Sequence, residues 1–167
     1  MHRIAPLVRR PLFSVASRLT ILATLIVSAC GGSESPTTPS NPANDTYASA
    51  LGVSIANMTK KSDALYYQDV VVGTGAEAIA GKTLGMNYTG YLVSGTKFDS
   101  NAGKNLFSFT LGIGEVISGW DQGIAGMKVG GKRKIVIGST LAYGAGGSGV
   151  IGPNATLVFD VELVTVK

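Results

Sequence analysis

The segment Gly114-Glu-Val-Ile-Ser-Gly-Trp-Asp-Gln-Gly-Ile-Ala-Gly-Met127 is the one stretch of this chain that keeps a helical period. Its apolar residues recur at spacings of three, four and three: Ile117, Trp120, Ile124 and Met127. The spacing predicts a short helix, with Asp121 in its first turn and Gly126 at its C-terminal end. Gly119 and Gly123 each weaken such a helix by about 1 kcal/mol relative to alanine. We therefore expect the helix to persist only if it packs against other elements.

The segments on either side of this helix have the composition of strands. Runs rich in β-branched and aromatic residues predict strands over residues 65–72, 83–93, 106–111, 133–138 and 155–166. In the last run, one face carries Leu157, Phe159, Val161 and Leu163, and the opposite face carries Asp160 and Glu162. The chain also has 23 glycines in short separate clusters, which suit tight turns. The expected fold is α+β, with an antiparallel sheet packed on one short helix.

The net charge of +4 comes from the first 30 residues, which hold four arginines and no acid. Beyond them, basic and acidic side chains are equal in number, so we expect no nucleic-acid partner. The only histidine is His2 and the only cysteine is Cys30. If the N-terminal segment is removed, Ser-His-Asp and Cys-His catalysis and histidine-ligated metal sites are excluded. We expect no cofactor, no metal and no disulfide within the chain.

Five blocks of sequence occur in the order typical of one enzyme family. They are Tyr88-Thr-Gly90, Gly95-Thr-Lys-Phe-Asp-Ser100, Gly114-Glu-Val-Ile-Ser-Gly-Trp120, Ala142-Tyr-Gly144 and Ala155-Thr-Leu-Val-Phe-Asp-Val-Glu162. Together they resemble the signature of FKBP-type peptidyl-prolyl cis–trans isomerases, from about residue 64 to the C-terminus. The resemblance implies a strongly bent sheet, a half-barrel, wrapped around the short helix. It also implies isomerase activity on X–Pro bonds, with proline-containing polypeptides as substrates and macrolides as inhibitors.

The resemblance further implies a proline pocket between sheet and helix. Its expected lining is Tyr88, Phe98, Asp99, Phe107, Val116, Ile117, Trp120, Tyr143, Ile151 and Phe159. By family pattern, Trp120 forms the floor, and the Ile117 amide and the Tyr143 hydroxyl donate to substrate carbonyls. Asp99 lies near the carbonyl of the bond that rotates. We thus assign Asp99, Tyr143 and Trp120 to catalysis and the other lining residues to substrate binding.

Two loops depart from the family pattern. The segment between Phe98 and Phe107 is one residue short, and Gly103-Lys104 replaces a frequent arginine. The loop 144–152 is also short and has five glycines, so we expect it to be mobile unless it is pinned. Lys132-Arg133-Lys134 is interpreted as a solvated strand segment. A second function stays open, a proline-motif binding module or chaperone with little turnover.

The N-terminal residues are typical of an export signal. A basic segment, 1–18, precedes 11 apolar residues, 19–29, which are too few for a good bilayer span of about 20. Val27-Ser28-Ala29-Cys30 resembles the lipobox of bacterial lipoprotein precursors, which implies cleavage after residue 29 and acylation of Cys30. A plain signal peptide or a short buried helix is the alternative interpretation.

These features predict the order of the chain's parts. A signal peptide (1–29) is followed by an acylated cysteine with a flexible tether (30–46), a lead-in segment (47–63) and the isomerase domain (64–167). The expected location is the cell envelope, in an outer membrane facing the periplasm or the cell surface. The residue after Cys30 is Gly31 and not the aspartate that retains lipoproteins in the inner membrane of enteric bacteria. We expect a monomer, since the lead-in is too short for the helical dimerisation domain of some relatives.

Overall fold

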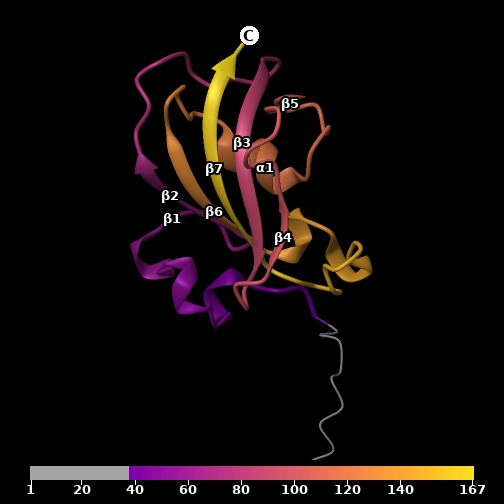
Figure 1. Ribbon diagram of the computed structural model, residues 1–167. Helices are drawn as coiled ribbons and strands as arrows, with labels where there is room; N and C mark the ends of the chain where they lie inside the picture. Colours follow the sequence, from indigo (N-terminus) through magenta and orange to yellow (C-terminus); the bar gives the residue numbers. More distant parts are fainter. Residues whose placement is uncertain (1–37) are drawn as a thin grey trace, which may run out of the picture. The chain divides into compact units, whose positions relative to one another are not determined.

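The structure is a computed structural model that describes residues 38–167; the expected signal peptide and Cys30 lie outside the described residues. Within 38–167, one antiparallel sheet has the strand order β1-β2-β6-β7-β3-β4, with β5 paired to β3 (Figure 1). The strands are β1 (Thr59–Ser62), β2 (Leu65–Val71), β3 (Thr83–Leu92), β4 (Lys97–Ser100), β5 (Phe107–Thr110), β6 (Lys132–Ile137) and β7 (Leu157–Val166). The sheet is curved and does not close, and the helix α1 (Ser118–Ile124) lies against one face (Figure 1). The predicted α+β class is confirmed.

Short 3-10 helices complete the described part of the chain. They are η1 (Pro42–Asn44), η2 (Ser49–Leu51), η3 (Ile55–Asn57), η4 (Ser139–Leu141) and η5 (Gly144–Gly146). The five predicted strands are all present, with ends shifted by at most two residues. β1 and β4 were not predicted, because neither has the alternating apolar pattern of a half-buried strand. No helix among residues 38–167 is long and apolar enough to cross a membrane.

The two glycines that weaken α1 allow it to lie close to the sheet. A Cβ atom on Gly119 would be 2.4 Å from Cγ2 of Ile137 in β6, and one on Gly123 would be 3.0 Å from Cγ2 of Ile135. Any larger residue would push the helix outward. The helix and the inner face of the sheet enclose the main core, which includes Leu65, Leu84, Met86, Trp120, Ile124, Ile135, Ile137, Leu157, Phe159 and Leu163. Packing of this face compensates for the low helical propensity of α1.

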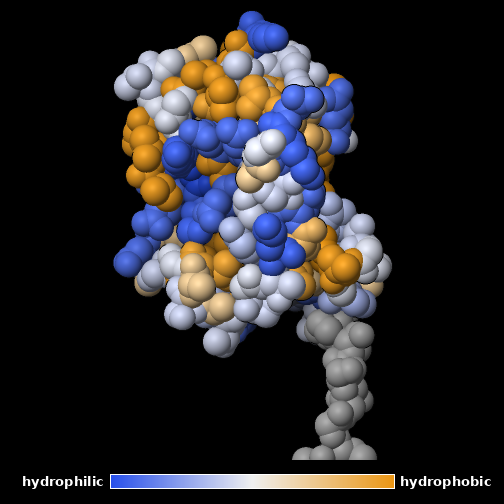
Figure 2. Space-filling view, in the orientation of Figure 1, coloured by the Kyte–Doolittle hydropathy of each residue, from blue (hydrophilic) through white to orange (hydrophobic). Residues whose placement is uncertain are grey.

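The outer face of the sheet changes in character along β6 and β7. At one end, Lys132 pairs with Glu162 and Lys134 pairs with Asp160 across the two strands. Figure 2 shows this polar band facing the viewer. At the other end the cross-strand partners are Val136 and Val158, both fully buried. Because these two valines point away from the main core, another part of the chain must shield them from water.

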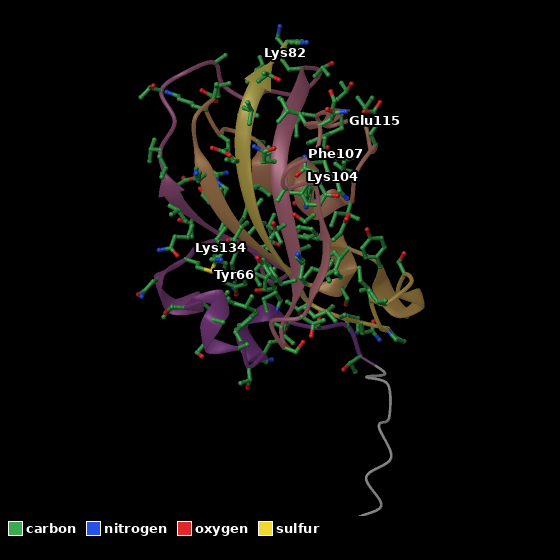
Figure 3. All side chains as sticks on the ribbon, viewed as in Figure 1. Tyr66, Lys82, Lys104, Phe107, Glu115 and Lys134 are labelled. Carbon is green, nitrogen blue, oxygen red and sulfur yellow. The ribbon has the colours of Figure 1, made fainter. Side chains whose placement is uncertain are left out.

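The first described residues, 38–58, called the N-terminal segment from here on, supply that cover. Leu51 and Met58 pack with Tyr66, Val136 and Val158 in a second apolar cluster. Figure 3 shows Tyr66 beside this segment, which crosses the lower end of the sheet. The predicted lead-in is therefore part of the folded unit, and β1 adds a strand to the sheet edge by pairing with β2.

The expectation of a flexible tether does not hold for residues 40–46. Ser40 and Ser139 exchange two hydrogen bonds, each from a backbone N–H to the other's hydroxyl, at 3.0 and 2.9 Å. Pro42 is buried, and the Tyr47 hydroxyl donates to its carbonyl at 2.7 Å. Contacts between residues about one hundred positions apart fix this segment, and a polar composition gives no sign of them.

The interpretation of residues 132–134 as solvated is wrong for Arg133. This side chain is 7% exposed and donates two hydrogen bonds to the Asp69 carboxylate, at 2.7 and 3.0 Å. A third bond, of 2.7 Å, runs to the Gly123 carbonyl of α1. The guanidinium therefore joins the helix to β2 and β6. Alternation along β6 turns Arg133 inward, between the outward Lys132 and Lys134.

Replacing Leu51 with alanine should lower the free energy of unfolding by about 2–5 kcal/mol, because it opens a cavity over the outer apolar face. Urea unfolding of the protein gives the measurement. The matched control is Ile79→Ala, at a side chain that is 52% exposed, which should change stability by less than about 0.5 kcal/mol. Equal stability of Leu51→Ala and the native protein would show that this cover does not stabilise the sheet.

Candidate functional site

A cavity of about 360 Å³ opens between the inner face of the sheet and α1. It is lined by Tyr88, Phe98, Asp99, Phe107, Glu115, Val116, Ile117, Trp120, Tyr143 and Phe159. All of the predicted pocket residues except Ile151 are therefore brought together. Their roles in binding and catalysis stay predictions. Glu115 was not among them, although it lies within one of the five sequence blocks.

Trp120 forms the floor of this cavity. Its side chain comes from the first turn of α1 and is 4% exposed. Three aromatic rings stand nearly perpendicular to the indole: Tyr88 at 5.2 Å and 84°, Phe107 at 5.8 Å and 87°, and Phe159 at 5.3 Å and 86°. Edge-to-face contact is a preferred geometry for aromatic pairs. The result is an apolar cup with a flat base and upright walls.

Two further residues hold the cup in shape and were not found from the sequence. Phe109 is 3% exposed and packs against Trp120 with ring centroids 5.7 Å apart. Gly90 faces two wall residues, since a Cβ atom there would be 2.6 Å from the Phe98 ring and 2.8 Å from the Phe159 ring. Its place in the Tyr-Thr-Gly block was a signal, but only the structure shows that the walls need the space.

The polar edge of the cavity is built on Tyr88 and Asp99. The Tyr88 hydroxyl donates to Oδ2 of Asp99 at 2.6 Å, and the backbone N–H of Ser100 donates to Oδ1 at 2.8 Å. Burial and the Asp99 carboxylate raise the pKa of Tyr88 to about 12. The hydroxyl therefore stays protonated and donates its hydrogen bond throughout the neutral pH range. This bond and the Ser100 N–H hold the Asp99 carboxylate in one position.

Asn101 fixes β4 beside β3. It is 7% exposed, and its Oδ1 accepts from the backbone N–H of Tyr88 at 2.7 Å. Its Nδ2 donates to the carbonyls of Met86 and Asn105, at 2.9 and 3.1 Å. Buried amides satisfied in this way lock backbone segments together. Sequence reasoning missed Asn101, since a lone asparagine after a strand is most often a turn residue.

The loop that carries Val116 and Ile117 is shaped by two carboxylates. Asp121 accepts from the backbone N–H groups of Gly112 and Gly114, at 2.8 and 3.1 Å. Glu115 accepts from the N–H of Thr110 at 2.6 Å. The loop leads into α1 at Ile117, whose carbonyl accepts from the N–H of Trp120. Among the described residues nothing accepts from the Ile117 N–H, so this donor is available at the cavity.

The opposite rim is formed by Tyr143, which is followed by the loop 144–152. Tyr143 is 40% exposed, and within residues 38–167 its hydroxyl has no hydrogen-bond partner. Ile151 is 7% exposed and belongs to the core, so it supports the loop and does not line the cavity. Ser148 and Ile151 exchange backbone hydrogen bonds of 2.8 and 2.9 Å. The loop expected to be mobile is therefore pinned by a tight turn, in which Gly147 leaves no room for a Cβ.

Comparisons with known proteins agree with this geometry. The family "FKBP-type peptidyl-prolyl cis-trans isomerase" matches residues 75–164. An FK506-binding protein of Neisseria meningitidis serogroup B is 52% identical over 104 residues, which are 61% of this chain and 95% of that protein. FK506-binding protein 4 of Dictyostelium discoideum is 53% identical over 102 residues, which are 60% of this chain and 28% of that protein.

Solved structures give the same result. The crystal structure of FkpA from Escherichia coli matches with a TM-score of 0.61 and 44% identity, over 66% of this chain and 51% of that chain. The crystal structure of AtFKBP13 matches with a TM-score of 0.57 and 40% identity, over 62% of this chain and 93% of that chain. Fold, cavity and sequence define a proline-directed rotamase. The chain belongs to the FKBP-type peptidyl-prolyl cis–trans isomerase family.

The raised pKa of Tyr88 makes a pH-dependent contribution to stability. Because the folded-state pKa lies near 12 and the ordinary value is near 10, this contribution is complete below pH 10 and is lost as pH rises through 12. We expect ¹³C-labelled tyrosine NMR to show Tyr88 titrating well above the exposed tyrosines. Tyr88→Phe should remove that signal and make stability fall less steeply above pH 10. A Tyr88 titration centred near 10 would contradict the half-buried, hydrogen-bonded geometry of this hydroxyl.

Proposed function

We propose that this enzyme is a membrane-tethered folding catalyst that isomerises X–Pro bonds of exported proteins. The observation that carries the proposal is the aromatic cup over Trp120, with its few donors at the rim. This cup is an apolar pocket suited to a proline ring, and the groups at its rim can orient the neighbouring amide. The macrolide FK506, in the names of several relatives, is a candidate inhibitor of this same cup.

The chemistry needed here is rotation without bond cleavage. The barrier about a peptide C–N bond is about 18–20 kcal/mol, and uncatalysed X–Pro exchange takes tens to hundreds of seconds. In the twisted state the amide loses resonance, so its carbonyl is less polar and its nitrogen more pyramidal. A water-poor pocket binds that state better than the planar amide, and this difference in binding is the catalysis. Every ~1.4 kcal/mol of preference gives a tenfold rate increase.

In this proposal the polar groups divide the work of holding the substrate. The Ile117 N–H and the Tyr143 hydroxyl, both without acceptors among residues 38–167, donate to substrate carbonyls on either side of the proline. Asp99 is held by Tyr88 and Ser100, so its negative charge stays fixed beside the carbonyl that rotates. Trp120 provides the flat apolar surface under the proline ring.

Tyr143→Phe should lower kcat/KM on a proline peptide by up to about tenfold, the value of one net hydrogen bond of 0.5–1.5 kcal/mol. Tyr91→Phe is the matched control, because Tyr91 packs on the outer face, and it should leave kcat/KM unchanged. Trp120→Ala should abolish most activity and also lower stability by about 3–5 kcal/mol. Complete loss of activity in Tyr143→Phe would reveal a chemical role that this mechanism does not contain.

The same measurements separate this function from the alternative of a proline-motif binding module. An isomerase should accelerate exchange at catalytic enzyme concentrations and lose that activity when FK506 is added. A binding module would retain affinity for proline peptides, and lose it in Trp120→Ala, with no acceleration at any concentration. The second result would remove catalysis from the proposal and leave the pocket intact.

Location is proposed from the sequence motif Val27-Ser28-Ala29-Cys30. We expect Cys30→Ser to block acylation, so that the protein is recovered unprocessed or in the soluble fraction. The native protein should stay with outer membranes after washing without detergent. The soluble variant should sediment as a monomer. Unchanged membrane fractionation of Cys30→Ser would refute the lipid anchor, and a stable dimer would refute the monomer.

A further inference from the structure

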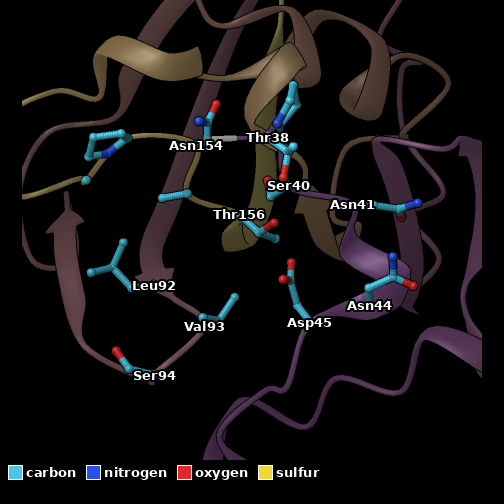
Figure 4. Close-up of a pocket in the computed structure, with 14 residues that line it drawn as sticks. Thr38, Ser40, Asn41, Asn44, Asp45, Leu92, Val93, Ser94, Asn154 and Thr156 are labelled. Carbon is cyan, nitrogen blue, oxygen red and sulfur yellow. The ribbon is translucent and has the colours of Figure 1, made fainter. Parts of the chain in front are cut away.

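A second cavity, of about 530 Å³, lies at the end of the sheet where the N-terminal segment packs (Figure 4). Three segments enclose it: residues 38–45, the end of β3 with the following turn (92–94), and residues 152–156 just before β7. None of its lining residues lines the proline pocket. Its volume falls in the range of small-molecule sites.

Hydrogen bonds to other parts of the chain hold all three walls of this cavity. Ser40 is bound to Ser139 by the two exchanged hydrogen bonds. The backbone N–H of Ala48 donates to the Val93 carbonyl at 2.8 Å, which joins the N-terminal segment to the β3 turn. The N–H of Asn154 donates to the Gly144 carbonyl at 2.8 Å. The cavity is therefore formed before any ligand arrives.

Two residues in the wall of this cavity each have a buried polar atom with no hydrogen-bond partner in the described part of the chain. These atoms are Oδ2 of Asp45 and Oγ1 of Thr156. Thr156 is 4% exposed, and Figure 4 shows the Asp45 carboxylate directed toward it. Buried polar groups in folded proteins are almost always satisfied by protein, water or a ligand. Both atoms can accept a hydrogen bond.

Of the described residues that line the cavity, Asp45 is the only charged one. Its negative charge acts on its surroundings: burial and the neighbouring Asp45 carboxylate raise the pKa of Tyr47. The rest of the wall includes apolar side chains, namely Pro39, Leu92, Val93, Pro153 and Ala155. A fitting ligand therefore carries a positive, hydrogen-bond-donating group on a short apolar stem.

We propose that this cavity binds an alkylammonium group, from a lysine side chain or from a small free amine. The ammonium offers three donors, enough for Asp45 and Thr156 together, and its methylene stem matches the apolar wall. A calcium ion fits less well, since it takes six to eight oxygen ligands and the lining residues within 38–167 include a single carboxylate. Residues 38–167 contain no cluster of three or more metal-ligating side chains.

The test is an NMR titration of the full chain with n-butylammonium, and with n-butanol as the neutral probe of the same shape. Butylammonium should shift the amide signals of residues 38–45, 92–94 and 152–156 with a Kd of about 1 mM or tighter. Signals of the proline pocket should not move. Butanol should bind at least tenfold more weakly.

Asp45→Asn keeps the shape of the side chain and removes its charge, so it should weaken butylammonium binding at least tenfold. Asp63→Asn is the control, at an aspartate whose side chain is 84% exposed, and binding should be unchanged. Thr156→Val is a second variant that removes the other free acceptor, for use if Asp45→Asn does not fold. Equal affinity for butanol, no shift with butylammonium, or full affinity in both variants would each overturn the proposal.

Two further probes identify the source of the ammonium group. N-acetyl-lysine methylamide is compared with N-acetyl-norleucine methylamide, which has the same stem without the charge. Binding of the lysine probe at the same signals would support a lysine side chain of a polypeptide. Binding of butylammonium alone would support a free amine, because the peptide backbone would then be too large for the cavity.

Discussion

The packing of Trp120 between α1 and the sheet is the contact on which the rest of this structure depends. Its indole is at once the base of the main core and the floor of the cavity. It reaches that position only because Gly119 lets the helix approach Ile137 closely. Stability and function therefore share one side chain, and a change that damages the floor also loosens the helix from the sheet.

A short helix with two glycines cannot hold its own position, so the fold fixes it from three sides. Apolar packing supplies the inner contact, and the Arg133 guanidinium binds the Gly123 carbonyl near the helix end. Asp121 ties the preceding loop through two backbone N–H groups. These polar contacts keep the Ile117 N–H at the rim of the cup, because they set the backbone that carries it. Donors that are already fixed in place lose little conformational entropy when a ligand binds.

The two faces of the sheet have different tasks. The inner face, with the helix, makes the aromatic cup. The outer face is charged along one half and apolar around Val136 and Val158, and the N-terminal segment covers the apolar half. By closing that face, residues 38–51 also create a second, more polar cavity around Asp45 and Thr156. Protection of the sheet and formation of a new cavity thus have one cause.

Local pattern was sufficient for much of the fold. Alternation along residues 157–163 predicted a strand with Leu157, Phe159, Val161 and Leu163 inward, and all four are buried in the core. The helical spacing of Ile117, Trp120 and Ile124 predicted α1. Five ordered sequence blocks predicted the family and most of the residues that meet around the cavity, although Ile151 was wrongly included and Glu115 was missed. Periodicity and short motifs can be recognised in a sequence because each depends on residues close together along the chain.

Tertiary structure decided what depends on partners far apart in the sequence. β1 exists because β2 offers it a paired edge, although Thr59–Ser62 has no apolar alternation. Arg133 is buried because Asp69 and Gly123 satisfy it, and Ser40 is fixed because Ser139 lies opposite. Asp45 and Thr156 line one cavity only after the N-terminal segment has packed on the sheet. Sequence alone determined which residues are apolar and how they repeat; three-dimensional packing determined which polar groups find partners and which remain free to bind.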